Sequence, residues 1–151
     1  MTLLHDAEPV TLGVHLRSSV MGVVEARQSE VLDRVQQLER SGTVEDVSVS
    51  HWASTVTAPD DGAPNDSGCP DVVTELYEFV ADSDHSLRPF FRERTGNDRT
   101  RTTLFLPVVC VVVRRGGTVE GVFPSTRKGR HWSVQDGLDA LEAGEFLATV
   151  D

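Results

Sequence analysis

The stretch that decides the fold is Thr103-Leu-Phe-Leu-Pro-Val-Val-Cys-Val-Val-Val-Arg-Arg-Gly-Gly-Thr-Val-Glu-Gly-Val-Phe123. From Leu104 to Val113 every residue is apolar, and most are β-branched. Side chains of a strand alternate between two faces, so a run that is apolar throughout must be covered on both faces. The run is too short to cross a membrane, and β-branching favours a strand over a buried helix. We therefore predict a central strand, with a bulge or local edge at Pro107, which cannot donate a ladder hydrogen bond.

The run ends at a glycine pair, Gly116-Gly117, after which a strand-like pattern resumes. Glycine supplies the positive φ of a tight hairpin turn at no steric cost. The sequence therefore predicts an antiparallel hairpin with strands at 102–114 and 118–123.

Alternating apolar residues predict half-buried strands over 10–17 and 44–57. Between them the period changes to that of a helix over 23–41, in which Glu30 and Arg34 have the spacing of an ion pair. A strand, a helix and a strand in this order form a βαβ unit, so we expect the two strands to be parallel.

The remainder of the chain alternates between loops and helices. The polar stretch 58–70 predicts a flexible loop, because it has almost nothing to bury. Apolar spacing predicts helices over 72–82 and 134–143, the second capped by the serine before it, and a short helix within 83–97. The stretch 124–130 is predicted to be a basic loop.

The predicted order is thus β-α-β-α-(α)-β-β-α. This order defines a single-domain α/β (α+β) sandwich, 1–151, with helices packed on a mixed sheet of about four strands. A chain of 151 residues is long enough to bury such a core without a metal or a disulfide.

The charge balance is unusual. The formal net charge is −10, and Lys128 is the only lysine among fourteen cationic residues. Surface carboxylates keep a protein hydrated and soluble where salt screens long-range repulsion, so this composition predicts a halophilic archaeal source. The acidity is then an adaptation to solvent and says little about the partner.

The same composition sets the expected compartment. Cys110 lies inside the core run and Cys69 in the polar loop, so a disulfide between them is not expected. The N-terminus has no basic region followed by an apolar segment, and no stretch is a candidate membrane span. We expect a cytoplasmic protein that does not interact with membranes.

The sequence holds no pattern for catalysis, for a metal or for a cofactor. His15 and His51 could face each other across neighbouring strands, but neither stands in a nucleophile or paired-carboxylate context. Cys-x-x-Cys and His-x-x-x-His spacings are missing, and the glycine pair does not precede a helix as a phosphate loop would. We predict no catalytic residue, no metal and no cofactor.

Two groups of residues around clustered cationic side chains are the candidate binding residues. They lie at the hairpin turn and after its second strand, and they are Arg114, Arg115, Arg127, Lys128 and Arg130 with the neighbouring His131 and Trp132. Arginines beside a tryptophan can grip phosphate and stack on a base, or bind an acidic peptide. Alternatively, the arginines pair with the abundant carboxylates. The sequence does not decide whether the two groups form one patch.

Two resemblances bear on function. The stretch from Val23 to Val49, which contains Leu38-Glu39-Arg-Ser-Gly-Thr-Val44, resembles the helix, turn and strand of winged-helix regulators and implies a possible DNA-binding role. It departs from them because a strand precedes the helix and because acidic residues balance its arginines.

The whole chain resembles a family of small haloarchaeal proteins, some of which are labelled helix-turn-helix proteins. The resembling segments are Leu106–Cys110, Gly121–Pro124 and Val134–Glu142. This resemblance implies no established activity.

Two functional hypotheses follow. The first is a non-catalytic regulatory or interaction module that binds a protein partner or itself, as a homodimer, through the strand Val119–Phe123 if that strand lies at a sheet edge. The alternative is a nucleic-acid-binding transcriptional regulator that uses the arginines between 114 and 132 or the helix at 23–41.

Overall fold

The computed structural model describes residues 9–18, 21–57, 71–81, 83–88, 90–95 and 102–143. The helices are α1 (Val23–Arg40), α2 (Asp71–Ala81) and α3 (Val134–Ala143). The strands are β1 (Val10–Arg17), β2 (Asp46–Trp52), β3 (Thr55–Thr57), β4 (His85–Ser86), β5 (Arg92–Thr95), β6 (Thr102–Phe105), β7 (Val109–Arg115), β8 (Thr118–Phe123), β9 (Ser125–Arg127) and β10 (Arg130–Trp132). The predicted loop at 58–70 lies outside the described residues.

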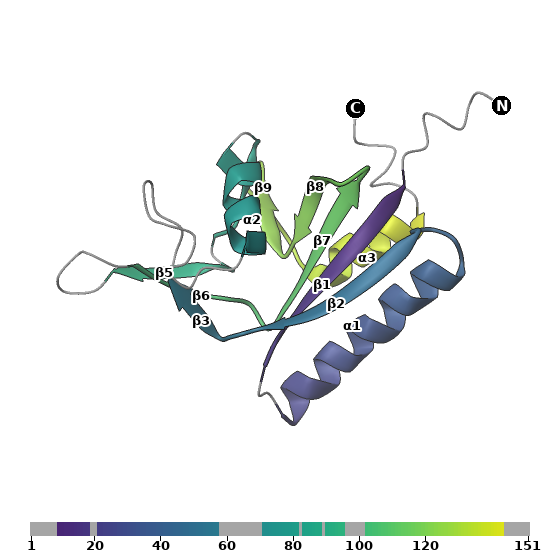
Figure 1. The fold of residues 1–151 in the computed structure, drawn as a ribbon, viewed down its shortest axis with the longest axis horizontal. Coiled ribbons are helices and arrows are strands. Elements are labelled where there is room, and N and C mark those ends of the chain that lie inside the picture. The colour runs from purple at the N-terminus through teal and green to yellow at the C-terminus, as the bar shows by residue number, and fades with distance from the viewer. Residues whose placement is uncertain are drawn as a thin grey trace.

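The main sheet has four strands in the order β2-β1-β7-β8 (Figure 1). Strand β1 is parallel to β2 and antiparallel to β7, which forms a hairpin with β8. These pairings confirm the mixed α/β class, the sheet of about four strands and the parallel βαβ unit. The apolar strand β7 lies between that unit and its own hairpin partner β8.

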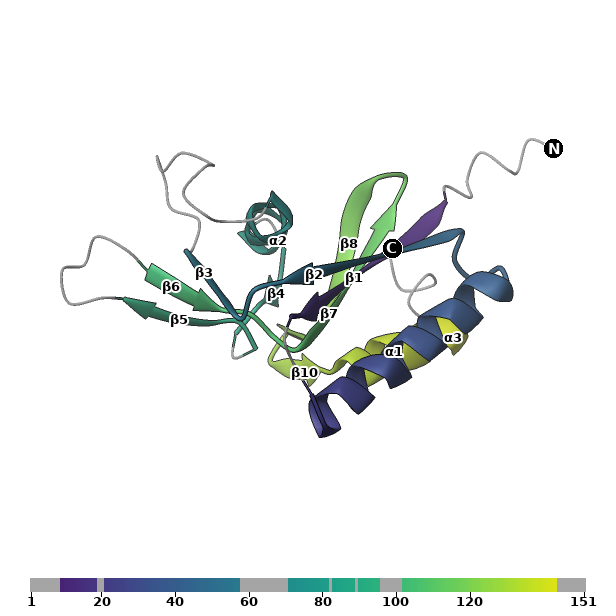
Figure 2. The same cartoon turned by 60° about the horizontal axis from the view of Figure 1, so that its bottom comes forward.

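Strand β7 contributes to two cores, one on each face of the sheet. Val109, Val111 and Val113 pack with α1 and α3, whereas Cys110 and Val112 pack on the side of α2. Figure 2 shows α2 on one side of the main sheet and α1 with α3 on the other. The five side chains are at most 6% exposed. The two-sided cover expected from the unbroken apolar run is therefore confirmed.

The apolar run is nevertheless interrupted, because β6 and β7 are separate strands divided at Leu106–Val108. The carbonyl groups released by this break find other donors. The Trp52 indole donates to the oxygen of Pro107 (3.2 Å), and the backbone N–H of Arg17 donates to that of Val108 (2.9 Å). The predicted irregularity at Pro107 is thus a change of sheet, since β6 pairs with β3 and β5.

The predicted strand 44–57 is also two strands, since β2 ends at Trp52 and β3 begins at Thr55 in the other sheet. The short helix predicted within 83–97 is wrong. Only one helix-like turn forms there, in which the N–H groups of Phe90 and Phe91 donate to the carbonyl of Leu87. Strands β4 and β5 flank that turn. The predicted basic loop 124–130 is wrong as well, because it contains β9 and the tight turn into β10.

The helices follow the predicted pattern with one correction. Gly42 takes a φ of 82° after α1, and Ser133 and Asp136 cap α3 reciprocally, each backbone N–H donating to the other side chain at 3.0 Å. The ion pair expected between Glu30 and Arg34 is wrong, because Arg34 reaches across to α3. None of the helices in the described ranges is long and apolar enough to cross a membrane.

Helix α3 packs on β8 through a glycine. A Cβ atom at Gly137 would lie 2.4 Å from the ring of Phe123, which is buried. In an exposed helix a glycine-to-alanine change stabilises by about 1 kcal/mol. Here we expect Gly137→Ala to destabilise the chain by about 1–3 kcal/mol, because two packed elements must separate. Urea denaturation measures the difference, and Ser29→Ala on the exposed side of α1 is the control. A variant as stable as the wild type would contradict this packing.

Candidate nucleic-acid interface

The predicted residues at the end of β7 are already paired. The Nε and Nη2 atoms of Arg114 both donate to the carboxylate of Glu75 on α2. Arg115 donates to Glu120 on β8 at 2.9 Å. Each arginine is half-buried and held by a carboxylate. Their charges are therefore largely neutralised within the chain.

The other five predicted residues lie on the β9–β10 hairpin. Arg127 and Lys128 each approach a carboxylate oxygen of Asp84 at 3.8 Å. The guanidinium of Arg130 lies 4.4 Å from the ring centre of Trp132, and the rings of His131 and Phe90 meet edge to face at 5.5 Å. Among the residues described, no hydrogen bond or ion pair joins this hairpin to Arg114 or Arg115. Their use as a single binding patch stays a prediction.

A different surface carries unpaired arginines. Strands β3, β6 and β5 form a three-stranded antiparallel sheet that extends away from the main sheet in Figures 1 and 2. One face of this small sheet is turned inward. Leu104 is fully buried in the core beneath α2, and Glu93 accepts hydrogen bonds from Tyr77 (2.6 Å) and Arg88 (3.2 Å). The inward face is therefore both packed and charge-balanced.

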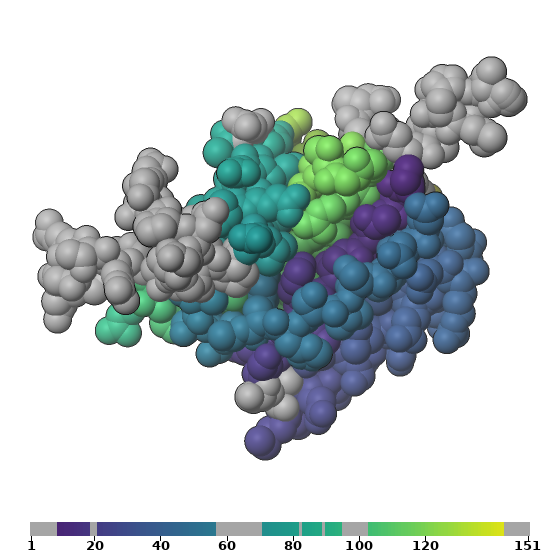
Figure 3. Space-filling view, viewed as in Figure 1, coloured from purple at the N-terminus to yellow at the C-terminus, as the bar shows by residue number. Residues whose placement is uncertain are grey.

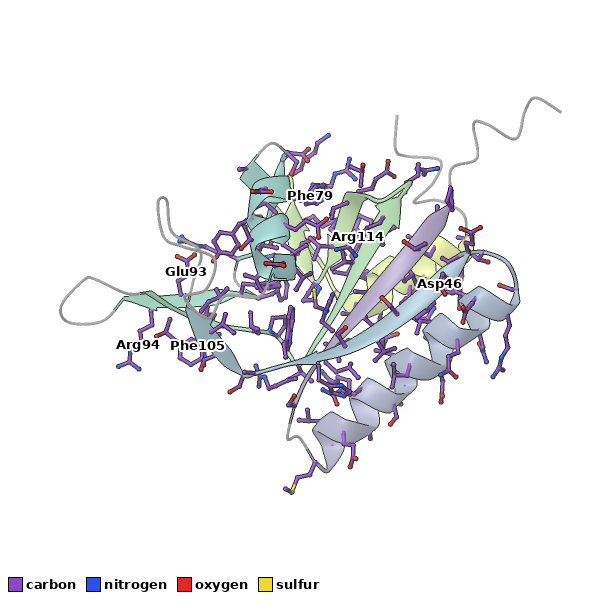
Figure 4. All side chains as sticks on the ribbon, in the orientation of Figure 1. Asp46, Phe79, Glu93, Arg94, Phe105 and Arg114 are labelled. Carbon is purple, nitrogen blue, oxygen red and sulfur yellow. The ribbon has the colours of Figure 1, made fainter. Side chains whose placement is uncertain are left out.

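The opposite face has a different composition. Paired residues of antiparallel strands point to the same side, and Arg92 pairs with Phe105 as Arg94 pairs with Thr103. Phe105 also pairs with Thr55 of β3. We call these five residues the arginine face. Figure 4 shows Arg94 and Phe105 on one side of the small sheet and Glu93 on the other.

The arginine face carries positive charge, whereas the chain as a whole is strongly negative. Arg92, Arg94, Thr103 and Thr55 are exposed, and the guanidinium of Arg92 lies 5.3 Å from the ring centre of Phe105. Neither Arg92 nor Arg94 has a carboxylate partner in the described part of the chain, and the face itself has no acidic residue. On a protein of net charge −10 this is a local cationic surface with one aromatic ring.

Sequence reasoning missed this surface. Its signal is the alternation Arg92-Glu93-Arg94-Thr95, which places both arginines on one side of a strand but not of a helix. The prediction of a helix there hid that pattern. The connection from β5 to β6 adds Asp98, Arg99 and Arg101 to the sequence, but these lie outside the described residues.

The groove between α1 and α3 is less suited to phosphate. It has a volume of about 890 Å³ and an apolar floor that includes Val31, Val109 and Pro124. Its rim carries Glu30, Asp33 and Arg27, and Arg34 is neutralised by Asp139 (2.8 Å) and Glu142 (3.1 Å) on α3. Carboxylates therefore outnumber free cations, and the predicted contact of the helix at 23–41 with DNA gains no support from this side of α1.

The histidines are held away from one another. His51 pairs with Leu16, whose side chain faces the α1 core, while His15 stacks on Trp52 at 5.1 Å on the other face of the sheet. The expectation that His15 and His51 face each other is therefore wrong. Burial and the Arg114 charge lower the pKa of His15 to about 4, so it is neutral at pH 7.

Two further groups are also shifted by burial. Burial lowers the pKa of His85 and raises the pKa of the Cys110 thiol, which is fully buried. Within the described ranges, no three His, Cys, Asp or Glu side chains gather where a metal ion would need them.

The fold and this face define an α/β module with a cationic surface on an extended sheet. A family model described as a helix-turn-helix domain matches residues 4–145, so the chain belongs to that family. No curated protein and no solved structure matches the chain.

The described residues do not contain the helix-turn-helix motif that the family description names. A helix-turn-helix consists of two successive helices joined by a short turn. In the ranges given above, α1 is followed by β2, and strands also separate α2 from α3. Helices α1 and α3 do pack together, but they are distant in sequence. Any contact with nucleic acid must therefore be sought on a surface other than a helix pair of that kind.

The pKa of His15 leads to a pH prediction. Because its folded pKa is near 4 and the ordinary value is 6.5, the unfolded chain binds more protons between these values. The contribution of neutral His15 to the free energy of unfolding is complete above pH 6.5 and is lost as the pH falls towards 4. We expect His15→Gln to flatten the pH dependence of unfolding in this window relative to the wild type.

Thermal unfolding between pH 4 and 7 measures this difference. His51→Gln, an exposed position on β2, is the control and should keep the wild-type slope. Equal slopes in wild type and His15→Gln would contradict the burial argument.

Proposed function

We propose that the chain is a nucleic-acid-binding module that contacts the phosphate backbone through the arginine face. The observation that carries the proposal is the pair of exposed arginines Arg92 and Arg94, which have no carboxylate partner among the described residues. They lie on an acid-free sheet face of a strongly acidic chain. Membership of a family described as a helix-turn-helix domain supports the same class of partner.

The chemistry of the face suits this role. Guanidinium groups donate several hydrogen bonds in a fixed plane that matches phosphate, and threonine hydroxyls add donors to the backbone. The ring of Phe105 offers a surface on which an unpaired base can stack. Two-stranded β-ribbons are also an established way to enter a groove of duplex DNA. Strands β5 and β6 are antiparallel neighbours, but they belong to a three-stranded sheet.

We further propose that this module is regulatory, cytoplasmic and non-catalytic, and that its source is a halophilic archaeon. The acidic, lysine-poor composition supports the source, since a surface of carboxylates stays hydrated in concentrated salt. The neutral His15 and the buried Cys110 thiol support a binding role, since neither is placed as an activated nucleophile or base.

The double variant Arg92→Ala/Arg94→Ala tests the interface. Fluorescence anisotropy with duplex and single-stranded DNA, over the salt range in which circular dichroism shows a folded chain, gives the affinity. Each phosphate contact contributes about 0.9 to the slope of log K against log salt on duplex DNA. We expect the variant to bind more weakly and to lower the slope by roughly 1–2.

The matched control is Arg127→Ala/Lys128→Ala, which removes the same charge from residues already close to Asp84. We expect it to bind as the wild type does. If the control loses affinity and Arg92→Ala/Arg94→Ala does not, the β9–β10 hairpin is the interface and the arginine face is not. If the wild type binds neither form of DNA, the proposed function is wrong.

A further inference from the structure

The outer edge of β2 is the most exposed strand edge of the main sheet. β2 is the terminal strand of the order β2-β1-β7-β8, and in the described part of the chain its seven residues pair with β1 alone. Figure 3 shows β2 at the surface, between β1 and α1. A terminal strand leaves a row of backbone N–H and C=O groups without strand partners.

This edge lacks the usual protection. Natural edge strands are blunted by lysine, by proline or by a bulge. From Val47 to Trp52 the strand carries none of these, and its one charged residue is Asp46, at its beginning. A quarter of the whole chain is charged, so six successive positions without Asp, Glu, Lys or Arg stand out on an exposed edge.

The other edge of the sheet is different. The hairpin that ends in β8 contains a bulge between Val113 and Arg114, and Val119, Val122 and Phe123 are buried. A bulge increases the local twist and disfavours the addition of a further strand. β8 is the other terminal strand, so the condition for self-association through Val119–Phe123 is met, but its apolar side chains are buried inside the protomer.

Strand β2 can pair with a second copy of itself. If two copies pair antiparallel about Val49, then Val49 meets Val49, Ser48 meets Ser50 and Val47 meets His51. Asp46 falls opposite Trp52 of the other copy, and the two Asp46 carboxylates are about 20 Å apart at 3.3 Å per residue. No pair of like charges is brought together.

Val49 is the residue that gains most from such pairing. It lies beside Val14 on the face of the sheet that bears α1, yet it is 45% exposed, whereas Val14 is fully buried. It is one of three large apolar side chains that stand out as exposed in the described residues. A second Val49 across a two-fold axis would cover it with a side chain of the same shape.

We propose that two copies of this chain associate through antiparallel pairing of their β2 strands, with Val49 on the two-fold axis, to form one continuous eight-stranded sheet. The partner is a second copy because this pairing places Val49 against Val49 and opposes no like charges, as a closed two-fold contact requires. This proposal does not rest on the proposed nucleic-acid function.

Sedimentation equilibrium of the full chain tests it, with Val49→Lys and the control Val23→Lys. Val23, at 79% exposed, starts α1 and takes the same substitution away from the edge. We expect a wild-type dimer, a dimer of Val23→Lys, and a dissociation constant raised by more than about tenfold in Val49→Lys, where two lysines meet across the axis. A monomeric wild type, or a Val49→Lys dimer of unchanged affinity, would overturn the proposal.

A crosslinking variant covers the case in which Val49→Lys fails to fold. In a Cys69→Ser background the buried Cys110 is the one remaining thiol, so a new cysteine reports alone. Opposed residues of an antiparallel pair have Cα atoms about 4.5–5.5 Å apart, within the range of a disulfide. We expect Val49→Cys, but not Val23→Cys, to form a disulfide dimer on mild oxidation. Equal crosslinking of both, or crosslinking of neither, would contradict the pairing.

The dependence on salt concentration distinguishes the proposed dimer from the proposed nucleic-acid binding. Each copy carries a net charge of −10, so screening should strengthen the dimer as salt rises, whereas phosphate contacts weaken. A chain that dimerises without binding DNA disproves only the nucleic-acid function. A monomer that binds DNA disproves only the dimer.

Discussion

Strand β7 must be covered on both faces, and the rest of the structure depends on that constraint. Its alternate side chains enter two separate cores, so the protein needs helices on each side of one sheet. Burying a single valine side chain contributes about 1.5–3 kcal/mol, and Val111, Val112 and Val113 are all buried within one short strand. The position of α2 on one side, and of α1 with α3 on the other, follows from this strand.

The two-sided cover of β7 also determines which polar side chains hold the helices in place and which remain exposed. The α1 side is closed by a polar bridge in which Arg34 holds α3 through Gln135, Asp139 and Glu142. The α2 side is tied to the main sheet by Arg114 and Glu75, and to the small sheet by Tyr77 and Glu93. The small sheet is held to the core through its inward face. Its outward face, with Arg92 and Arg94, remains accessible to a partner.

Sequence patterns were sufficient for the elements that bury an apolar stripe. The parallel β1-α1-β2 unit and α3 have apolar periodicity, and β7 is marked by its unbroken apolar run. These patterns predicted the elements of the main sheet, but not that β1 is the strand of the unit that pairs with β7. The small sheet could not be found in this way. β3, β5 and β6 have three or four residues each, and their outward positions hold mainly threonine and arginine, with Phe105 as an apolar residue. A period of two cannot be recognised over so few positions.

The choice among the arginines could not come from the sequence either, because it depends on distant carboxylates. Arg114 forms an ion pair with Glu75, thirty-nine positions away in the sequence. Arg127, on the β9–β10 hairpin, forms one with Asp84, which directly precedes β4. Arginines that are close in the sequence therefore suggested a cationic patch, although Arg114, Arg115 and Arg127 lie beside carboxylates in the folded chain. Arg27 and Arg40 on α1 remain among acidic neighbours of the same helix. Arg92 and Arg94 differ from all of these, since they are exposed on a face without carboxylates. In an acidic protein the informative quantity is the charge left after internal pairing, and that charge is positive on the outward face of β5.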